Sequence, residues 1–147
     1  MQWSKSLRIV VLGFVTWLVP YIVSFGFYDR SGNLNVSYGL FKSVMVVLSS
    51  ITGMYVLSYH MRLISERFRK EGVIAGVAWL LINYVLDIIV FVPMAGMTIK
   101  DYFMTIGLGY LQIPVISTAV GIIIQRNLIA HKKFNGYEKE NVLYVRV

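Results

Sequence analysis

The sequence predicts an all-α integral membrane protein: a four-transmembrane-helix antiparallel bundle with both termini in the cytoplasm. Three observations predict this fold. Of the 147 residues, 57% are apolar and 14% are charged, against about 45–50% and about 25% in soluble domains. The apolar residues gather in four stretches of membrane-spanning length, and Lys and Arg gather on one side of them. A chain of this length is expected to form a single membrane domain, 1–147.

The first predicted helix covers residues 7–27, the length that a hydrocarbon layer of about 30 Å requires. Lys5 and Arg8 come before or early in its apolar run, an arrangement that signal peptides share. The run is too long for a signal peptide and lacks a small-residue cleavage site, so we expect a retained anchor. Residues 28–39 follow as a polar loop rich in turn-forming residues.

Three further helices are predicted at about residues 40–64, 73–93 and 102–124. A short charged turn at 65–72 and a brief loop at 94–101 separate them, and short connections favour antiparallel neighbours. Residues 125–147 are expected to form a basic cytoplasmic tail. Basic residues just beyond a span attract anionic lipid headgroups, by about 1 kcal/mol each.

The orientation follows from the positions of Lys and Arg in the connections. One side of the predicted bundle carries Lys5, Arg8, Arg62, Arg67, Arg69, Lys70, Arg126, Lys132, Lys133, Lys139 and Arg146. The other side carries Arg30, Lys42 and Lys100. Because basic connections stay in the cytoplasm, both termini are predicted there, in a plasma membrane. This asymmetry accounts for the net charge of +7, and no nucleic-acid partner is expected.

The composition also excludes several kinds of chemistry. No cysteine is present, which rules out disulfides, zinc–thiolate sites, iron–sulfur clusters and thiol redox catalysis. The two histidines, His60 and His131, are far apart in the chain and cannot supply the three or four ligands of a metal site. Phosphate-loop and hydrolase motifs are missing. We therefore expect no cofactor, no metal and no catalytic residues; an enzyme acting on lipids is the least favoured alternative.

Each predicted helix carries one stripe of small or polar residues at helical spacing. The clearest stripe, in 40–64, consists of Lys42, Ser49, Gly53 and His60; the others include Gly76, Asn83 and Asp87, and Thr105, Gly109 and Gln112. Such stripes usually form the contacts between helices in a membrane. The alternative is that they line a pathway, with Ser49, His60, Gln112 and Thr105 as its lining.

Asp87 is the one acid inside a predicted span. A charge buried in lipid costs at least about 2.5–3.5 kcal/mol, so Asp87 requires protonation, a cation partner or a water-filled cavity. Asn83 lies one helical turn before it, and Lys42 enters its helix from the same side. We therefore predict an ion or proton site of Asp87, Asn83 and Lys42. The alternative is a purely structural pair of Asp87 and Lys42.

Two classes of function are compatible with these features. The first is an oligomeric channel or a proton- or cation-linked transporter, with Asp87 in the pathway and with Gly109 and Pro114 as a hinge; a static kink is the alternative for the hinge. The second is a non-catalytic accessory or scaffold protein that binds another membrane protein through a pair of small residues. Three such pairs are Gly72-x-x-x-Gly76, Ser49-x-x-x-Gly53 and Ser117-x-x-x-Gly121. The expected partners are the bilayer, anionic headgroups at its cytoplasmic face, and either further copies of the chain or another membrane protein.

Overall fold

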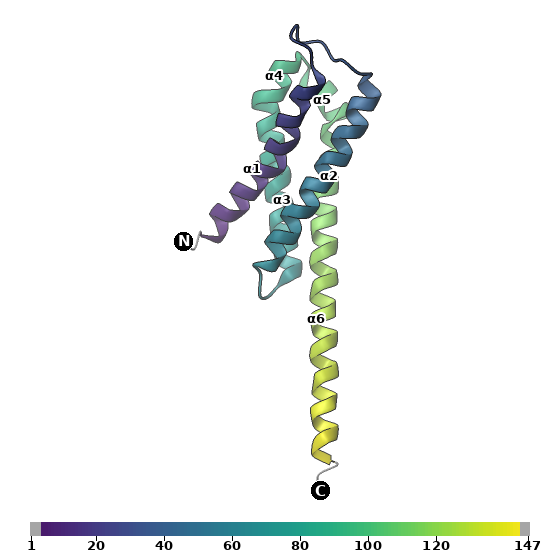
Figure 1. Cartoon of the computed structure of the whole chain (residues 1–147). Coiled ribbons are helices and arrows are strands. Elements are labelled where there is room, and N and C mark those ends of the chain that lie inside the picture. Colours follow the sequence, from purple (N-terminus) through teal and green to yellow (C-terminus); the bar gives the residue numbers. More distant parts are fainter. Residues whose placement is uncertain (1–3, 145–147) are drawn as a thin grey trace.

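The computed structural model describes the backbone of residues 4–144 and the side chains of residues 4–131 and 134. In that part of the chain the regular elements are helical, apart from an isolated β-bridge between Tyr28 and Leu34 (Figure 1). Four stretches there are long and apolar enough to cross a bilayer: Lys5–Phe27, Tyr38–Arg62, Phe68–Ala95 and Gly107–His131. The prediction of an all-helical chain with four helices of spanning length is confirmed.

The outside of the helices is covered by large apolar side chains. Met54, Ile89 and Val115 are each about two-thirds exposed, at 68%, 67% and 67%. Apolar surface on this scale is unfavourable in water and is the ordinary surface of a helix in lipid. The chain is a membrane protein.

The first span consists of α1 (Lys5–Ser24) and a 3₁₀ turn, η1 (Phe25–Phe27). In the loop that follows, Asp29 accepts hydrogen bonds from the backbone N–H groups of Ser31 and Asn33, both at 2.8 Å. These bonds, that of Asn33 above all, lower the pKa of Asp29. Gly32 has a φ of +80°, which glycine adopts without strain. The loop thus has the turn chemistry that its sequence predicts.

The second span is α2 (Tyr38–Arg62), and the third begins with α3 (Phe68–Leu86). The predicted turn at 65–72 is too long, because residues 68–72 are helical. Two contacts account for the earlier helix start: Glu71 is buried in an ion pair with Lys5 of α1, and Gly72 packs against α6. The charged residues of this segment are typical of a solvated turn, but one of them, Glu71, lies inside the third span.

The third span continues without a break through the π-helical segment η2 (Asp87–Phe91) into α4 (Val92–Ala95). The fourth predicted helix, 102–124, is wrong as a single helix. It is divided into α5 (Ile99–Thr105), the 3₁₀ segment η3 (Gly107–Leu111) and α6 (Gln112–Tyr144). Figure 1 shows α6 extending far past the other helices. The predicted tail is therefore helical as far as Tyr144, and residues 145–147 lie outside the described part.

The α3 helix occupies the centre of the packing, in contact with both α1 and α6. Its contact with α6 is so close that the glycine positions at the crossing have no room for a side chain. A Cβ atom on Gly76 would overlap Ser117 Oγ and lie 2.7 Å from Pro114 Cα. A Cβ atom on Gly72 would overlap the Ser117 carbonyl oxygen, and one on Gly121 would overlap that of Phe68. Two of the pairs predicted as partner-binding faces, Gly72-x-x-x-Gly76 and Ser117-x-x-x-Gly121, therefore pack against each other within the chain.

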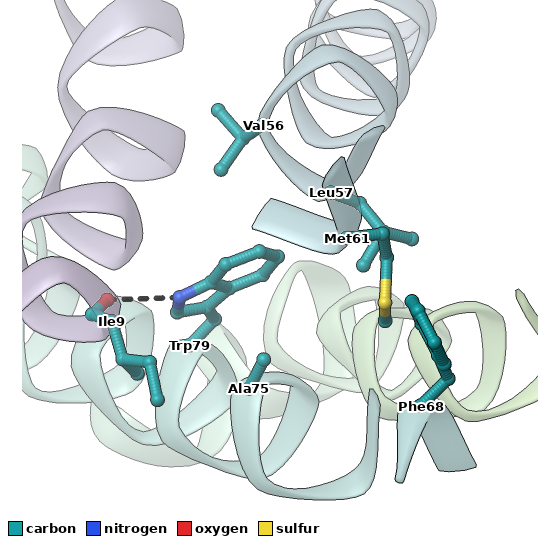
Figure 2. Close-up of a cluster of buried hydrophobic side chains, with 7 residues drawn as sticks. All are labelled: Ile9, Val56, Leu57, Met61, Phe68, Ala75 and Trp79. Atoms are coloured by element: carbon teal, nitrogen blue, oxygen red, sulfur yellow. Dashed lines mark hydrogen bonds between the residues drawn. The ribbon is translucent and has the colours of Figure 1, made fainter. Parts of the chain in front are cut away.

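The hydrophobic core lies where α1, α2 and α3 meet, around Trp79 (Figure 2). Its buried members are Ile9, Val56, Leu57, Met61, Phe68, Ala75 and Trp79. The indole N–H of Trp79 donates to the carbonyl oxygen of Ile9 at 2.9 Å, which satisfies the one polar atom of this side chain. The core thus joins α1 to α3 and fixes the register between them.

Candidate functional site

Asp87 is 5% exposed and is the first residue of the π-helical segment. Three side chains donate hydrogen bonds to its carboxyl group. The indole N–H of Trp17 binds Oδ1 at 2.7 Å. The hydroxyls of Tyr102 and Tyr110 both bind Oδ2, at 2.9 and 2.8 Å. We call these four residues the Asp87 cage.

The break before α6 brings the two tyrosines to one oxygen. On an unbroken α-helix, Tyr102 and Tyr110 would lie about 12 Å apart along the axis. Here Ile106 leaves the helical conformation, with φ −126° and ψ −52°, and residues 107–111 form the tighter 3₁₀ segment. Both hydroxyls consequently reach the same carboxylate oxygen. Irregular helical segments at membrane depth commonly mark functional positions.

Tyr84 of α3 holds the broken segment in place from the other side. Its hydroxyl donates to the carbonyl oxygen of Gly107 at 2.8 Å. Its ring packs against Phe103 and Tyr110, with centroids 5.2 and 5.9 Å apart. The position of η3 therefore depends on two tyrosine hydroxyl bonds, that of Tyr84 to Gly107 and that of Tyr110 to Asp87.

The cage forms one end of a buried column on α3. The members of the column are spaced four residues apart and are all at most 6% exposed: Glu71, Ala75, Trp79, Asn83 and Asp87. All of them except Ala75 bond to residues of α1. The column is about 24 Å long at 1.5 Å per residue. We call this contact between α1 and α3 the polar seam. It has a Glu71 end and an Asp87 end, with the core residues Ala75 and Trp79 between them.

Asn83, predicted beside Asp87, belongs to the polar seam. Its amide group donates to Thr16 Oγ1 at 3.0 Å and to the Trp79 carbonyl oxygen at 2.8 Å. The Thr16 hydroxyl in turn donates to the carbonyl oxygen of Gly13 at 2.7 Å. Asn83 therefore lies one turn from Asp87 and bonds to α1 rather than to the carboxyl group.

The structure does not bring Lys42 to Asp87. Lys42 is exposed on α2, and the groups that bond Asp87 are the indole and the two phenols of the cage. Burial favours the neutral acid, whereas three donated hydrogen bonds favour the carboxylate. The cage thus accommodates both protonation states without a cation among the described residues in contact with Asp87.

The four predicted pathway residues do not form one lining. Ser49 is half-buried on α2, and Gln112 is exposed at the start of α6. Thr105 donates to the carbonyl oxygen of Asp101 in its own helix at 2.6 Å. His60 is fully buried, but it packs against Trp79 near the Glu71 end of the seam. Among the four, only His60 lies beside the polar seam.

The two predicted hinge residues also have different positions. Gly109 lies inside the 3₁₀ segment, is exposed, and has open space where a Cβ would be. Pro114 is the third residue of α6, where its missing N–H belongs to the unbonded first turn. Pro114 also packs directly against Gly76. The break in this span therefore lies at 106–111 and includes Gly109, whereas Pro114 sits on a fixed contact.

Sequence reasoning did not identify Trp17, Tyr102 and Tyr110 as partners of Asp87, or Glu71 as a second buried acid. Aromatic residues in membrane helices are commonly apolar packing or interface anchors, so nothing marks these three in the sequence. Trp17 and Asp87 are 70 positions apart, beyond any local spacing rule. Glu71 would have been found from an earlier start of the third helix.

The described residues contain no group of three histidine, cysteine, aspartate or glutamate side chains placed to hold a metal ion. No known protein family, characterised protein or solved structure matches the chain. Its function therefore has to be inferred from the Asp87 cage and the polar seam.

Proposed function

We propose that the chain is a small proton-linked membrane transporter that works as a homo-oligomer, with Asp87 as the group that binds and releases the proton. The convergence of three donors from three separate elements on one buried carboxyl group carries the proposal. The distribution of Lys and Arg supports a location in the plasma membrane with both termini on its cytoplasmic side. The short connections support an antiparallel bundle.

The chemistry of the cage favours a proton over a metal cation. A metal cation needs several lone-pair ligands around it. The groups that face the Asp87 oxygens are N–H and O–H donors, each already directed at the carboxylate. A proton needs only one oxygen, and a phenol can accept as well as donate. The cage can therefore take up a proton by turning a tyrosine hydroxyl.

The proton is expected on Oδ2, the oxygen shared by the two tyrosines. An indole N–H can only donate, so Trp17 keeps Oδ1 as an acceptor in both states. When Oδ2 carries the proton, it donates to one tyrosine oxygen and the second tyrosine bond is weakened. Because Tyr102 and Tyr110 belong to α5 and η3, proton binding changes how firmly this broken segment is held to α3.

A transporter fits better than an open channel. Asp87 is 5% exposed and Tyr102 is 0% exposed, so the site is closed to both sides in this conformation. Transport then requires the broken segment to move, as discontinuous helices do in alternating access. One protomer encloses little space, which is the reason for proposing an oligomer.

The test is proton flux into proteoliposomes under an imposed pH gradient. Asp87→Asn keeps the size of the side chain and removes its titration, and we expect it to abolish flux. Asp101→Asn is the matched control, because Asp101 is an exposed acid at the start of α5, and this variant should retain native flux. If Asp87→Asn, correctly folded, carries the same flux as the native chain, the proposal is wrong.

An accessory or scaffold role is the alternative, and one observation favours it. Of the three small-residue pairs, Ser49-x-x-x-Gly53 on α2 is the one whose glycine has open space where a Cβ atom would be. Small residues at such positions let a second helix approach closely. Purification from native membranes in mild detergent separates the two roles. A constant stoichiometric partner would support the scaffold, and a self-sufficient homo-oligomer would support the transporter.

A further inference from the structure

His60 is a buried histidine whose ring nitrogens make no hydrogen bond to the described residues. It lies in the last turn of α2 and is 0% exposed. Neither Nδ1 nor Nε2 has a hydrogen-bond partner among the described residues. Its ring packs edge-on against Trp79, with centroids 5.7 Å apart and planes at 74°. A neutral imidazole carries one donor and one acceptor nitrogen, and buried atoms of this kind are normally paired.

Two charged residues near His60 also have buried polar atoms without a hydrogen-bond partner. Glu71 Oε2 and Arg8 Nε are also buried without a partner in the described part of the chain. The charges of Arg8, Glu71 and Lys5 lie close enough to act on His60 electrostatically. Together the unpaired atoms include donors and acceptors, so a few water molecules can satisfy all of them. Such a composition is suited to a hydrated site that exchanges protons.

The ion pair between Glu71 and Lys5 connects these buried residues to the surface of the protein. Glu71 Oε1 is paired with the Lys5 ammonium group. The side chain of Lys5 is 52% exposed, whereas that of Glu71 is 7% exposed. This ion pair therefore links the aqueous surface to the Glu71 end of the polar seam, whose other end is Asp87.

We propose that His60 and Glu71 form a second proton-binding site, which exchanges protons between the aqueous surface at Lys5 and the Glu71 end of the polar seam. A proton from water binds a ring nitrogen of neutral His60, and the imidazolium later returns it to water or passes it towards the seam. Proton exchange with water is a property of the site itself, whereas transfer of the proton towards the seam rests on the proposed transport function.

The charges around His60 modify how readily its buried ring takes up the proton. Glu71 on α3 favours the imidazolium, and Lys5 and Arg8 on α1 oppose it. Within the described residues, α6 adds no charged group that acts on His60. The site is therefore tuned by opposite charges on the two helices that form the seam, and each can be removed separately.

The test is to follow His60 directly in the full chain. The sequence has only two histidines, so isotope-labelled histidine in lipid nanodiscs gives two sets of NMR signals. His131→Gln, a change at an exposed position of α6, leaves the signals of His60 alone. We expect these signals to change from neutral to charged imidazole between about pH 5 and 8. Signals that stay neutral throughout this range would refute the second site.

Two charge variants make the test sharper. Glu71→Gln and Arg8→Gln should each move the midpoint of the His60 titration by about one pH unit, in opposite directions, because they remove opposite charges. Shifts in the same direction, or no shift in either variant, would refute the arrangement proposed here. Circular dichroism of each variant establishes that it is folded.

Flux measurements separate this inference from the transport proposal. His60→Gln should lose the dependence of flux on the pH at the Lys5 side, whereas His131→Gln should keep it. If His60 titrates but the native chain carries no flux, the second site stands and transport fails. If Asp87→Asn abolishes flux while His60 does not titrate, transport stands and the second site fails.

Discussion

The α2 and α3 helices each carry a pair of small residues four positions apart, Ser49 and Gly53 on α2 and Gly72 and Gly76 on α3. The glycines of the two pairs have opposite surroundings. On α3, Gly72 and Gly76 lie against the backbone of α6, with no room for a Cβ atom at either position. On α2, a Cβ atom at Gly53 would meet nothing within 4 Å. A small-residue pair therefore permits a close approach between helices without specifying that one occurs.

The two helices also differ in what surrounds the small residues. The α3 helix packs against α1 along its buried column and against α6 at its glycines, so it has two contact surfaces within the chain. The buried residues of α2 lie near its two ends: Phe41, Val56, Leu57, His60 and Met61. Its middle has no fully buried residue and is only half-buried along one face. We expect substitutions in α3 to act on the fold and substitutions in the middle of α2 to spare it.

The largest loss of stability is expected for Gly76→Leu. The new side chain would overlap Ser117 Oγ and approach the backbone at Pro114, so α3 and α6 must separate. Overpacking of a close contact costs about 1–3 kcal/mol, occasionally more. The measurement is unfolding by SDS in mixed micelles, followed by circular dichroism. Gly53→Leu on α2 is the matched control and should unfold like the native chain. Equal losses for the two variants would contradict the contrast between the helices.

A smaller loss is expected for Tyr102→Phe. This variant removes one of the hydrogen bonds that tie the broken segment to the third span and leaves the ring in place. Hydrogen bonds between membrane helices contribute about 0.6 kcal/mol on average and up to about 1.7 kcal/mol, and a bond to a carboxylate belongs in the upper part of that range. Tyr55→Phe on α2, at 76% exposure, should change nothing in the same unfolding assay. A Tyr102→Phe variant as stable as the native chain would show that the cage does not hold this segment.

The fold was largely predictable from sequence, and the candidate site only in part. Spans are visible because lipid requires long apolar helices with their backbone bonds satisfied internally. Asp87 is visible because an acid is costly there. Its partners Trp17, Tyr102 and Tyr110 depend on the helix break at Ile106 and on the packing of α1 against α3. Those are tertiary features, and the residues concerned have the composition of ordinary membrane helices.

The break itself illustrates why local pattern was insufficient. The sequence predicts a hinge at Gly109 and Pro114, and Pro114 is included because a proline in a helix removes a backbone donor. The helix instead begins anew at Gln112, which places Pro114 in the first turn, where no donor is needed. The irregular conformation falls at residues 106–111, which contain Gly107 and Gly109. Glycine tolerates such a break, but the contacts of Tyr84 and Tyr110 with η3 determine its position.

Trp79→Phe should have a smaller effect than Tyr102→Phe. It removes the bond from the indole N–H to the Ile9 carbonyl oxygen, and a bond between neutral groups across membrane helices contributes about 0.6 kcal/mol. The phenyl ring retains most of the packing in the core. Unfolding by SDS should show a small loss, and Trp79→Ala should show a much larger one because it leaves a cavity. Equal losses for the two variants would assign the role of Trp79 to its hydrogen bond rather than to its volume.

The smallest effect, and one of opposite sign, is expected for Gly53→Ala. The added methyl group meets open space, and alanine is a better helix former than glycine by up to about 1 kcal/mol. The same substitution at Gly76 places the methyl group against Ser117 and Pro114 and should destabilise the chain. A rise in SDS resistance for one variant and a fall for the other would show that the surroundings, rather than the residue type, decide the outcome. Gly53→Ala could instead lower the stability, by an amount that grows with protein concentration. In that case α2 is in contact with a second copy of the chain in the membrane.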